Sequence, residues 1–303
     1  LVGVNSYFMN EIGWHNLQNL HTHFDLDMEF YHPNLKQYRE LVVYSLAKFD
    51  DINIPYQFIF HSFVKKVAQQ KKVRYIVYGE NQPTEQTGNF SNFDYPEKSL
   101  WFHLVFDFRS LDLDKFLGTG ASFNLSNLPM YQYPKQNSLY PKGVFLSHYI
   151  RWDSIKNNNT MANFGFWPEK QIRTYDRYHR AGYSHYYEIH DFLRFKKHGY
   201  IKVRDHLNRD IRMGHINREI AQKLYEGFLN IPYNFSEFFN WIGIEESGSE
   251  WLLRHKLSNQ NSKEFTLFEY EKFLKNFDLK GLIPQNHYLP FFKGVHIGDD
   301  YSG

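Results

Sequence analysis

The spacing of hydrophobic residues in the first part of the chain predicts strands and helices that follow one another along the sequence. Apolar side chains recur at helical spacing in residues 35–46 and 60–68. Residues 74–78 are mostly β-branched, apolar or aromatic, as in a core strand, and residues 26–30 alternate between apolar and acidic positions, as in a half-buried strand. Strands that alternate with helices in this way predict a parallel α/β sheet, with residues 74–78 as an inner strand.

The second part of the chain shows the spacing of helices. Asn217 and Ser236 each precede a run in which apolar residues recur at helical spacing, so we expect each of them to cap a helix. Gly214 and Gly243 are expected to end helices. The predicted organisation is an α/β domain at residues 1–143, a mainly helical region at 144–283 and a tail at 284–303.

The composition excludes several classes of protein. The 303 residues carry a formal net charge of +2, which gives no argument for a nucleic-acid partner. No apolar run approaches the roughly 18 residues that a membrane span needs. The sequence contains no cysteine, so neither disulfides nor thiolate metal sites can form within it. These features fit a cytoplasmic protein, and we predict that location.

A glycine turn with polar side chains follows the predicted inner strand. The sequence there is Val77-Tyr78-Gly79-Glu80-Asn81, with Glu85 a few residues further on. Ligands of open α/β sheets bind beyond the carboxyl ends of the strands, so Glu80, Asn81 and Glu85 are candidates for a functional site. In the alternative interpretation, Asn81 only stabilises its own turn.

This turn is one of three segments that fit the pattern of a known family. Residues 77–88 are similar to the pattern V-Y-G-E-N-x3-E-Y-G-G, although Gln86 and Thr87 replace its second tyrosine and the glycine that follows. Residues 145–154, F-L-S-H-Y-I-R-W-D-S, match a second block, and residues 195–221, which end in I-R-M-G-H-I-N-R-E-I-A, resemble a third. On these segments the chain resembles the N-acetyl sugar amidotransferases, a branch of the PP-loop ATP pyrophosphatase superfamily that builds acetamidino groups on bacterial surface sugars.

The resemblance implies a parallel-sheet PP-loop domain of the adenine nucleotide alpha hydrolase type. In that fold an S-G-G-x-D-S loop after the first strand binds the pyrophosphate of ATP. The sequence contains no such loop, and residues 1–5 resemble the second strand of the fold. Because Leu1 is not a methionine, we expect the loop to precede Leu1 in the complete protein.

The resemblance also implies a reaction, namely the ATP-dependent conversion of the N-acetyl group of a nucleotide-linked sugar to an acetamidino group. This reaction belongs to the biosynthesis of lipopolysaccharide O-antigen or another surface glycan, and it requires ATP and Mg²⁺. Ammonia would come from a glutaminase subunit through a cyclase-like ammonia-channel subunit. The residues implied in catalysis are Glu80, Asn81 and Glu85, with Glu80 and Glu85 also as metal ligands, and the implied ATP contacts are Val4, Asn5 and Gly79.

Charged residues in the second and third blocks are candidates for binding the sugar nucleotide. Asp205, Arg209 and Arg212 have the spacing of one helical face, and guanidinium groups bind phosphate in a bidentate manner. In the alternative interpretation they form a solvated face with weak ion pairs. The full set of candidate substrate-binding residues is Arg151, Asp153, Arg204, Asp205, Arg209 and Arg212.

Two other functions remain open. The chain could be another adenylating PP-loop enzyme, such as a tRNA-modifying ligase, or a loop-less, non-catalytic assembly subunit. His21-Thr22-His23 is similar to the H-x-H strand of metal-dependent amidohydrolases, but the residues before it have the spacing of a helix end rather than of a strand. We therefore do not predict metal-hydrolase chemistry.

Overall fold

The computed structural model describes residues 1–79, 97–98, 103, 111, 113–117, 128–134, 141–150, 153–182 and 184–244. The chain divides into two compact units. The first contains Leu1–Tyr7 and the described part of Leu26–Trp152, and the second contains Phe8–Asp25 and the described residues from Asp153 onward. The helix α1 (Glu11–His23) therefore belongs to the second unit, although the chain enters and leaves it through strands of the first.

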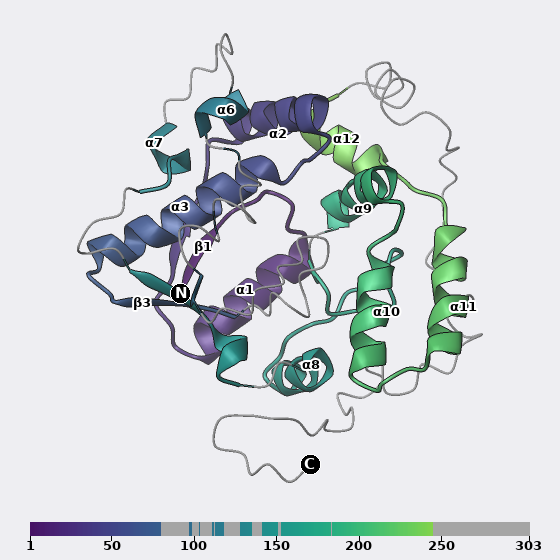
Figure 1. Ribbon diagram of the computed structural model, residues 1–303. Helices are drawn as coiled ribbons and strands as arrows, with labels where there is room; N and C mark the ends of the chain where they lie inside the picture. The colour runs from purple at the N-terminus through teal and green to yellow at the C-terminus, as the bar shows by residue number, and fades with distance from the viewer. Residues whose placement is uncertain are drawn as a thin grey trace. The chain divides into compact units, whose positions relative to one another are not determined.

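The first unit begins with a two-stranded parallel sheet. Strand β1 (Val2–Val4) pairs with β2 (Glu29–Tyr31), so that Val2 lies opposite Glu29. Helices α2 (Leu35–Phe49) and α3 (Ile54–Gln70) follow, as the hydrophobic spacing predicts (Figure 1). The side chain of Asn34 accepts a hydrogen bond from the backbone N–H of Gln37 and so begins α2. A proline occupies the start of α3, where its missing N–H costs nothing.

A second small sheet contains β3 (Tyr75–Tyr78), β5 (Lys142–Phe145) and β4 (Glu97–Lys98). Strands β3 and β5 are parallel, and β4 is antiparallel to β5. Among the described strands β3 lies at the end of the order β3-β5-β4, and Tyr75 and Val77 are 60% and 59% exposed. The expectation that residues 74–78 form an inner strand is therefore wrong for the described structure. The physical reason is that only one face of β3, that of Ile76 and Tyr78, has a packing partner among the described core residues.

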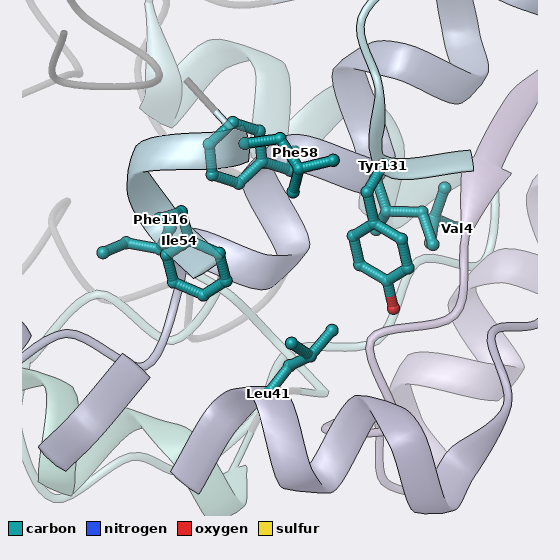
Figure 2. Packing of buried hydrophobic residues seen from close by; sticks show 8 residues of the cluster. Val4, Leu41, Ile54, Phe58, Phe116 and Tyr131 are labelled. Carbon is teal, nitrogen blue, oxygen red and sulfur yellow. The ribbon is translucent and has the colours of Figure 1, made fainter. Parts of the chain in front are cut away.

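The core of the first unit lies between its helices and β1. Figure 2 shows side chains from β1, α2, α3, α6 (Leu113–Leu117) and α7 (Leu128–Tyr131) that converge on one another. Burial of each large apolar side chain contributes roughly 1.5–3 kcal/mol, so this cluster stabilises the unit more than its short strands do. The buried members are Val4, Leu41, Ile54, Phe58, Ile59, Leu113, Phe116 and Tyr131.

The described part of the second unit is helical, and its helices between residues 154 and 242 agree with the mainly helical region predicted at residues 144–283. Besides α1 it contains α8 (Ser154–Asn163), α9 (Ser184–His198), α10 (Val203–Arg212), α11 (Arg218–Leu229) and α12 (Ser236–Ile242). In the first unit, a short 3-10 turn, η2 (Leu146–His148), follows β5 shortly before the chain enters the second unit.

The ends of these helices confirm most of the predicted signals. The Asn217 side chain accepts a hydrogen bond from the Ile220 N–H at 2.9 Å and caps α11. Gly214 and Gly243 follow α10 and α12 with positive φ of 74° and 72°, a conformation that favours glycine. Ser236 is not a cap, because its own N–H and hydroxyl donate to the Asn234 side chain instead.

The described structure is therefore a mixed α/β fold, mostly helical, with small sheets that contain parallel pairs. Within the described ranges, no helix is long and apolar enough to cross a membrane.

Candidate functional site

Helix α10 carries four of the six candidate substrate-binding residues, and it divides them between two faces. Arg204, Asn208 and Arg212 are exposed and lie at i, i+4 and i+8. Asp205 and Arg209 are buried, with 6% and 3% exposure. The interpretation of a solvated face therefore does not apply to Asp205 and Arg209, whereas Arg204 and Arg212 remain accessible to a ligand.

The first turn of α10 is held by buried charges. A carboxylate oxygen of Asp205 lies 2.5 Å from Nη2 of Arg194 and 3.5 Å from Nζ of Lys202. The Asp191 carboxylate accepts a hydrogen bond from the backbone N–H of Lys202 at 2.5 Å. Burial raises the pKa of Asp191 to about 6, although nearby Arg173 and the bond from Lys202 act in the opposite direction. These pairs offset the cost of removing the charges from water and fix where α10 begins.

The last turns of α10 are held in the same way. The guanidinium of Arg209 donates to Asp176 and to Asp210, each at 3.0 Å. The hydroxyl of Tyr175 donates to the other oxygen of Asp210 at 2.5 Å. Burial alone would raise the pKa of Asp210, but Arg209 and the hydrogen bonds to the carboxylate hold it below its usual value. Arg209 is thus committed to two carboxylates, and binding a phosphate would require it to leave them.

His215 lies between two buried carboxylates. After α10, Gly214 N–H donates to Ile211 and His215 N–H donates to the Asp210 carbonyl, the two bonds of a Schellman motif. This turn places Nδ1 of His215 3.5 Å from Oδ1 of Asp210 and Nε2 3.9 Å from Oδ2 of Asp153.

Asp153 has a structural role that its motif did not indicate. Its Oδ1 accepts a hydrogen bond from the Lys156 N–H at 3.1 Å and caps α8. Its Oδ2 is buried and has no hydrogen-bond partner in the described part of the chain. The carboxylate therefore caps α8 with one oxygen and lies beside the imidazole of His215 with the other.

Two further histidines pack against each other, His206 on α10 and His179 in the segment before α9. The rings of His179 and His206 lie 4.1 Å apart, and Nδ1 of His206 is 2.7 Å from Oγ1 of Thr174. Because Oγ1 of Thr174 already accepts a bond from the Asp176 N–H, its own hydrogen can be donated to His206. Burial, reinforced by nearby cations, lowers the pKa of both histidines well below the usual value. Both rings are therefore neutral at physiological pH.

The candidate ATP contacts lie in the first unit. Val4 is part of the hydrophobic core. The buried side chain of Asn5 lies 3.2 Å from Nδ1 of His32 and accepts a hydrogen bond from the Tyr7 N–H at 2.8 Å. Gly79 is exposed at the end of β3, and no atom of the described residues other than its chain neighbours lies within 4 Å of the position that a Cβ would take. The remaining candidates lie outside the described residues: Glu80, Asn81, Glu85 and Arg151.

The described residues give no metal centre. Within those ranges, no group of three or more His, Cys, Asp and Glu side chains could hold a metal ion. His21-Thr22-His23 lies at the end of helix α1 and not in a strand, which agrees with setting the amidohydrolase interpretation aside.

Sequence reasoning missed several members of the α10 network. The segment 172–180, I-R-T-Y-D-R-Y-H-R, interleaves charged residues and histidine with tyrosine, and this density of titratable side chains is a signal of a buried polar network. The members that were missed include Tyr175, Asp176, Arg194, Lys202, Asp210 and His215.

Comparison with known proteins gives one match to this region. Residues 170–279 match the family model described as "LPS biosynthesis protein WbpG-like, C-terminal domain". A search of curated proteins gives no match. The matched residues include α9 to α12 and every charged member of the α10 network except Asp153. Over this segment, the chain is similar to the C-terminal domain of WbpG-like proteins of lipopolysaccharide biosynthesis.

Proposed function

We propose that the protein is an ATP-dependent amidotransferase that converts the N-acetyl group of a nucleotide-linked sugar to an acetamidino group in lipopolysaccharide biosynthesis. The observation that carries the proposal is the similarity of residues 170–279 to a domain of lipopolysaccharide biosynthesis proteins. The blocks at residues 77–88, 145–154 and 195–221 narrow the reaction to amidotransfer, because they resemble the N-acetyl sugar amidotransferases.

The chemistry requires activation of a poor leaving group. Transfer of AMP from ATP to the amide oxygen forms an O-adenylyl imidate and releases pyrophosphate and the amide proton. Ammonia then attacks the imidate carbon, AMP leaves with the oxygen, and loss of a proton gives the amidine. As the resemblance implies, the ammonia would come from a separate glutaminase through a channel subunit, and the given sequence has no cysteine that could serve as a glutaminase nucleophile.

Helix α10 offers the sugar nucleotide an accessible cationic face. Arg204 and Arg212 are exposed and eight residues apart, which corresponds to roughly 12 Å along a helix. The guanidinium of Arg204 lies over the ring of Tyr200, with 4.9 Å between its central carbon and the ring centroid. Such an orientation leaves the guanidinium edge available to phosphate oxygens. In this proposal Arg204 and Arg212 bind phosphate, while buried Arg209 and Asp205 position the helix.

Mg²⁺ would supply charge neutralisation for the departing pyrophosphate. The described residues do not provide a cluster of ligands for it. On the resemblance of residues 77–88 to the family pattern, we assign Glu80 and Glu85 as the residues that would hold the metal. Asn81, in the same turn, would hydrogen-bond the ribose or the imidate.

The proposal can be tested by measuring AMP formation from ATP with the protein expressed from its complete gene, in the presence of ammonium and an N-acetylated nucleotide sugar. Arg204→Ala and Arg212→Ala should each raise KM for the sugar nucleotide by about tenfold or more, the effect of losing about 1.4 kcal/mol of binding. Lys197→Ala removes an exposed cation from α9 and serves as the matched control. Unchanged KM values in both arginine variants would remove α10 from the substrate site.

A further inference from the structure

Aromatic side chains from α1 and its C-terminal end, and from the turn after α8, form a row on the second unit. We call this surface the α1 aromatic strip, and it consists of His15, His23, Phe24, Phe164 and Trp167. None of these residues belongs to the α10 network or to the substrate site proposed above.

The strip is built by a specific turn after α8. The N–H groups of Gly165 and Phe166 donate to the Ala162 and Met161 carbonyls, which is a Schellman motif. Gly165 has φ of +85°, and a Cβ at this position would lie 3.0 Å from Oδ1 of Asn19. Glycine therefore allows the turn to lie directly against α1.

Side chains of α1 then fix the turn through its backbone. Asn16 donates to the Trp167 carbonyl at 3.0 Å and accepts from the Trp167 N–H at 2.8 Å. Asn19 donates to the Phe164 carbonyl at 2.6 Å, and Nε2 of His15 lies 3.2 Å from the Gly165 carbonyl. The aromatic rings are thus held on a rigid support and need no ordering before they bind a ligand.

The rings lie in two groups along α1. At one end the rings of His15 and Trp167 are stacked, with centroids 3.6 Å apart, and Trp167 is still 53% exposed. At the other end the ring of Phe164 lies 5.1 Å from that of His23 and 5.3 Å from that of Phe24. His15 and His23 are eight residues apart, so the strip extends over roughly 12 Å.

The two segments that form the strip lack acidic residues, lysine and arginine. Residues 14–24, W-H-N-L-Q-N-L-H-T-H-F, and residues 164–167, F-G-F-W, contain no Asp, Glu, Lys or Arg, although these residues make up 22% of the chain. The polar groups that accompany the rings are amides, imidazoles and a hydroxyl. Phosphate-bearing ligands bind to Lys and Arg, so this surface does not suit a nucleotide or a nucleic acid.

We propose that the α1 aromatic strip binds an uncharged oligosaccharide. A sugar ring has an apolar C–H face that stacks on aromatic rings, while its hydroxyls pair with neutral amides and imidazoles. The imidazoles of His15 and His23 supply such groups within the strip. A narrow, elongated strip accommodates several linked sugars better than a single one, and a preformed aromatic surface at the exterior marks an interaction site. The inference does not depend on amidotransferase activity.

The test is saturation-transfer difference NMR with the complete protein and two uncharged probes, maltotriose and triacetylchitotriose. At least one probe should receive saturation at its ring C–H protons. Trp167→Ala should weaken the binding at least tenfold, and Trp167→Tyr should retain most of it because the ring surface remains. Leu229→Ala, which removes an exposed apolar side chain on α11, should change nothing. Thermal melting should be the same for all variants, since the altered side chains are exposed.

Four results would overturn the proposal. The first is the absence of saturation transfer to either probe in the wild-type protein. The second is unchanged binding of the probes after Trp167→Ala. The other two would assign the strip to a different ligand. Sedimentation that shows a dimer which Trp167→Ala dissociates would instead assign the strip to a second copy of the chain. Binding to phosphatidylcholine vesicles that is lost in Trp167→Ala would assign it to a lipid surface.

Discussion

The Nη2 atom of Arg209 lies 3.0 Å from Oδ2 of Asp176, and both side chains are buried. Their charges can stay in the interior because they face each other and because Nε and Nη2 of Arg209 also donate to the Asp210 carboxylate. The pair connects α10 to the segment before α9, so the orientation of the exposed face of α10 depends on it.

Removal of this buried cation should destabilise the protein strongly. Arg209→Met leaves Asp176 and Asp210 buried without their guanidinium partner, and the free energy of unfolding should fall by about 3–5 kcal/mol. Arg212→Met, on the exposed face of the same helix, should change it by no more than about 0.5 kcal/mol. Urea denaturation followed by tryptophan fluorescence measures both values. Similar losses in the two variants would contradict the assignment of Arg209 to a buried, structural position.

Because of the buried pair His179 and His206, the free energy of unfolding should decrease in mild acid. Burial and nearby cations lower the pKa of His179 and His206 well below 6.5 in the folded protein. Between the folded pKa and 6.5 the unfolded chain binds more protons, so stability is complete above pH 6.5 and is lost as the pH falls. The melting temperature should therefore decrease from pH 7.5 to pH 5.5.

A variant separates this effect from other titrating groups. Asp191 acts with the opposite sign, because its pKa of about 6 exceeds its ordinary value of 3.8, and stability from this group falls as the pH rises between the two. His206→Asn removes one titrating ring and keeps an acceptor for the Thr174 hydroxyl. It should therefore show a shallower pH dependence than the wild type. An identical slope in both proteins would refute the role of His206.

In the first unit, Lys65 should produce a pH dependence on the alkaline side. Burial and the neighbouring charge of Lys98 lower the pKa of Lys65 to about 8 from its ordinary 10.5. Between these values the unfolded state binds more protons, so stability should rise with pH from 8 toward 10.5 and be lowest below 8. Urea denaturation at pH 7.5 and 9.5 measures the difference.

Two substitutions at this position separate the charge from the hydrogen bond. Nζ of Lys65 donates to the Pro141 carbonyl at 2.7 Å. Lys65→Gln keeps a donor and removes the charge, whereas Lys65→Met removes both. Each variant should lose the rise in stability between pH 7.5 and 9.5, and Lys65→Met should be the less stable of the two. A rise that persists in Lys65→Gln would mean that another group causes it.

Local sequence signals predicted the helices better than they predicted the sheet. The helical spacing of apolar residues and the cap at Asn217 depend on neighbours within a few positions, and the structure confirms both. The apolar run at residues 74–78 correctly predicted a strand, but it did not predict that this strand lies at the end of the described sheet. A strand's position depends on which distant segments pair with it, and a short apolar run carries no information about that.

The candidate site shows the same limit. Helical spacing grouped Asp205, Arg209 and Arg212, but the structure places the first two in the interior and the third at the surface. The partners that draw Asp205 and Arg209 inside, Arg194 and Asp176, come from segments before α10. Such long-range ion pairs cannot be read from the spacing within one helix. The predicted site at Glu80, Asn81 and Glu85 lies outside the described residues and stays a prediction.

The central claim is best tested by following isotopic nitrogen. The protein from its complete gene is supplied with ATP, Mg²⁺, an N-acetylated nucleotide sugar and ¹⁵N-ammonium, and the products are analysed by mass spectrometry. We predict that ¹⁵N enters the sugar as an acetamidino group and that AMP and pyrophosphate form in amounts equal to the labelled product. Glu80→Gln should slow this turnover greatly without lowering the melting temperature. Release of ADP, hydrolysis of ATP without the sugar, or AMP formation with no ¹⁵N in the sugar would contradict the assignment.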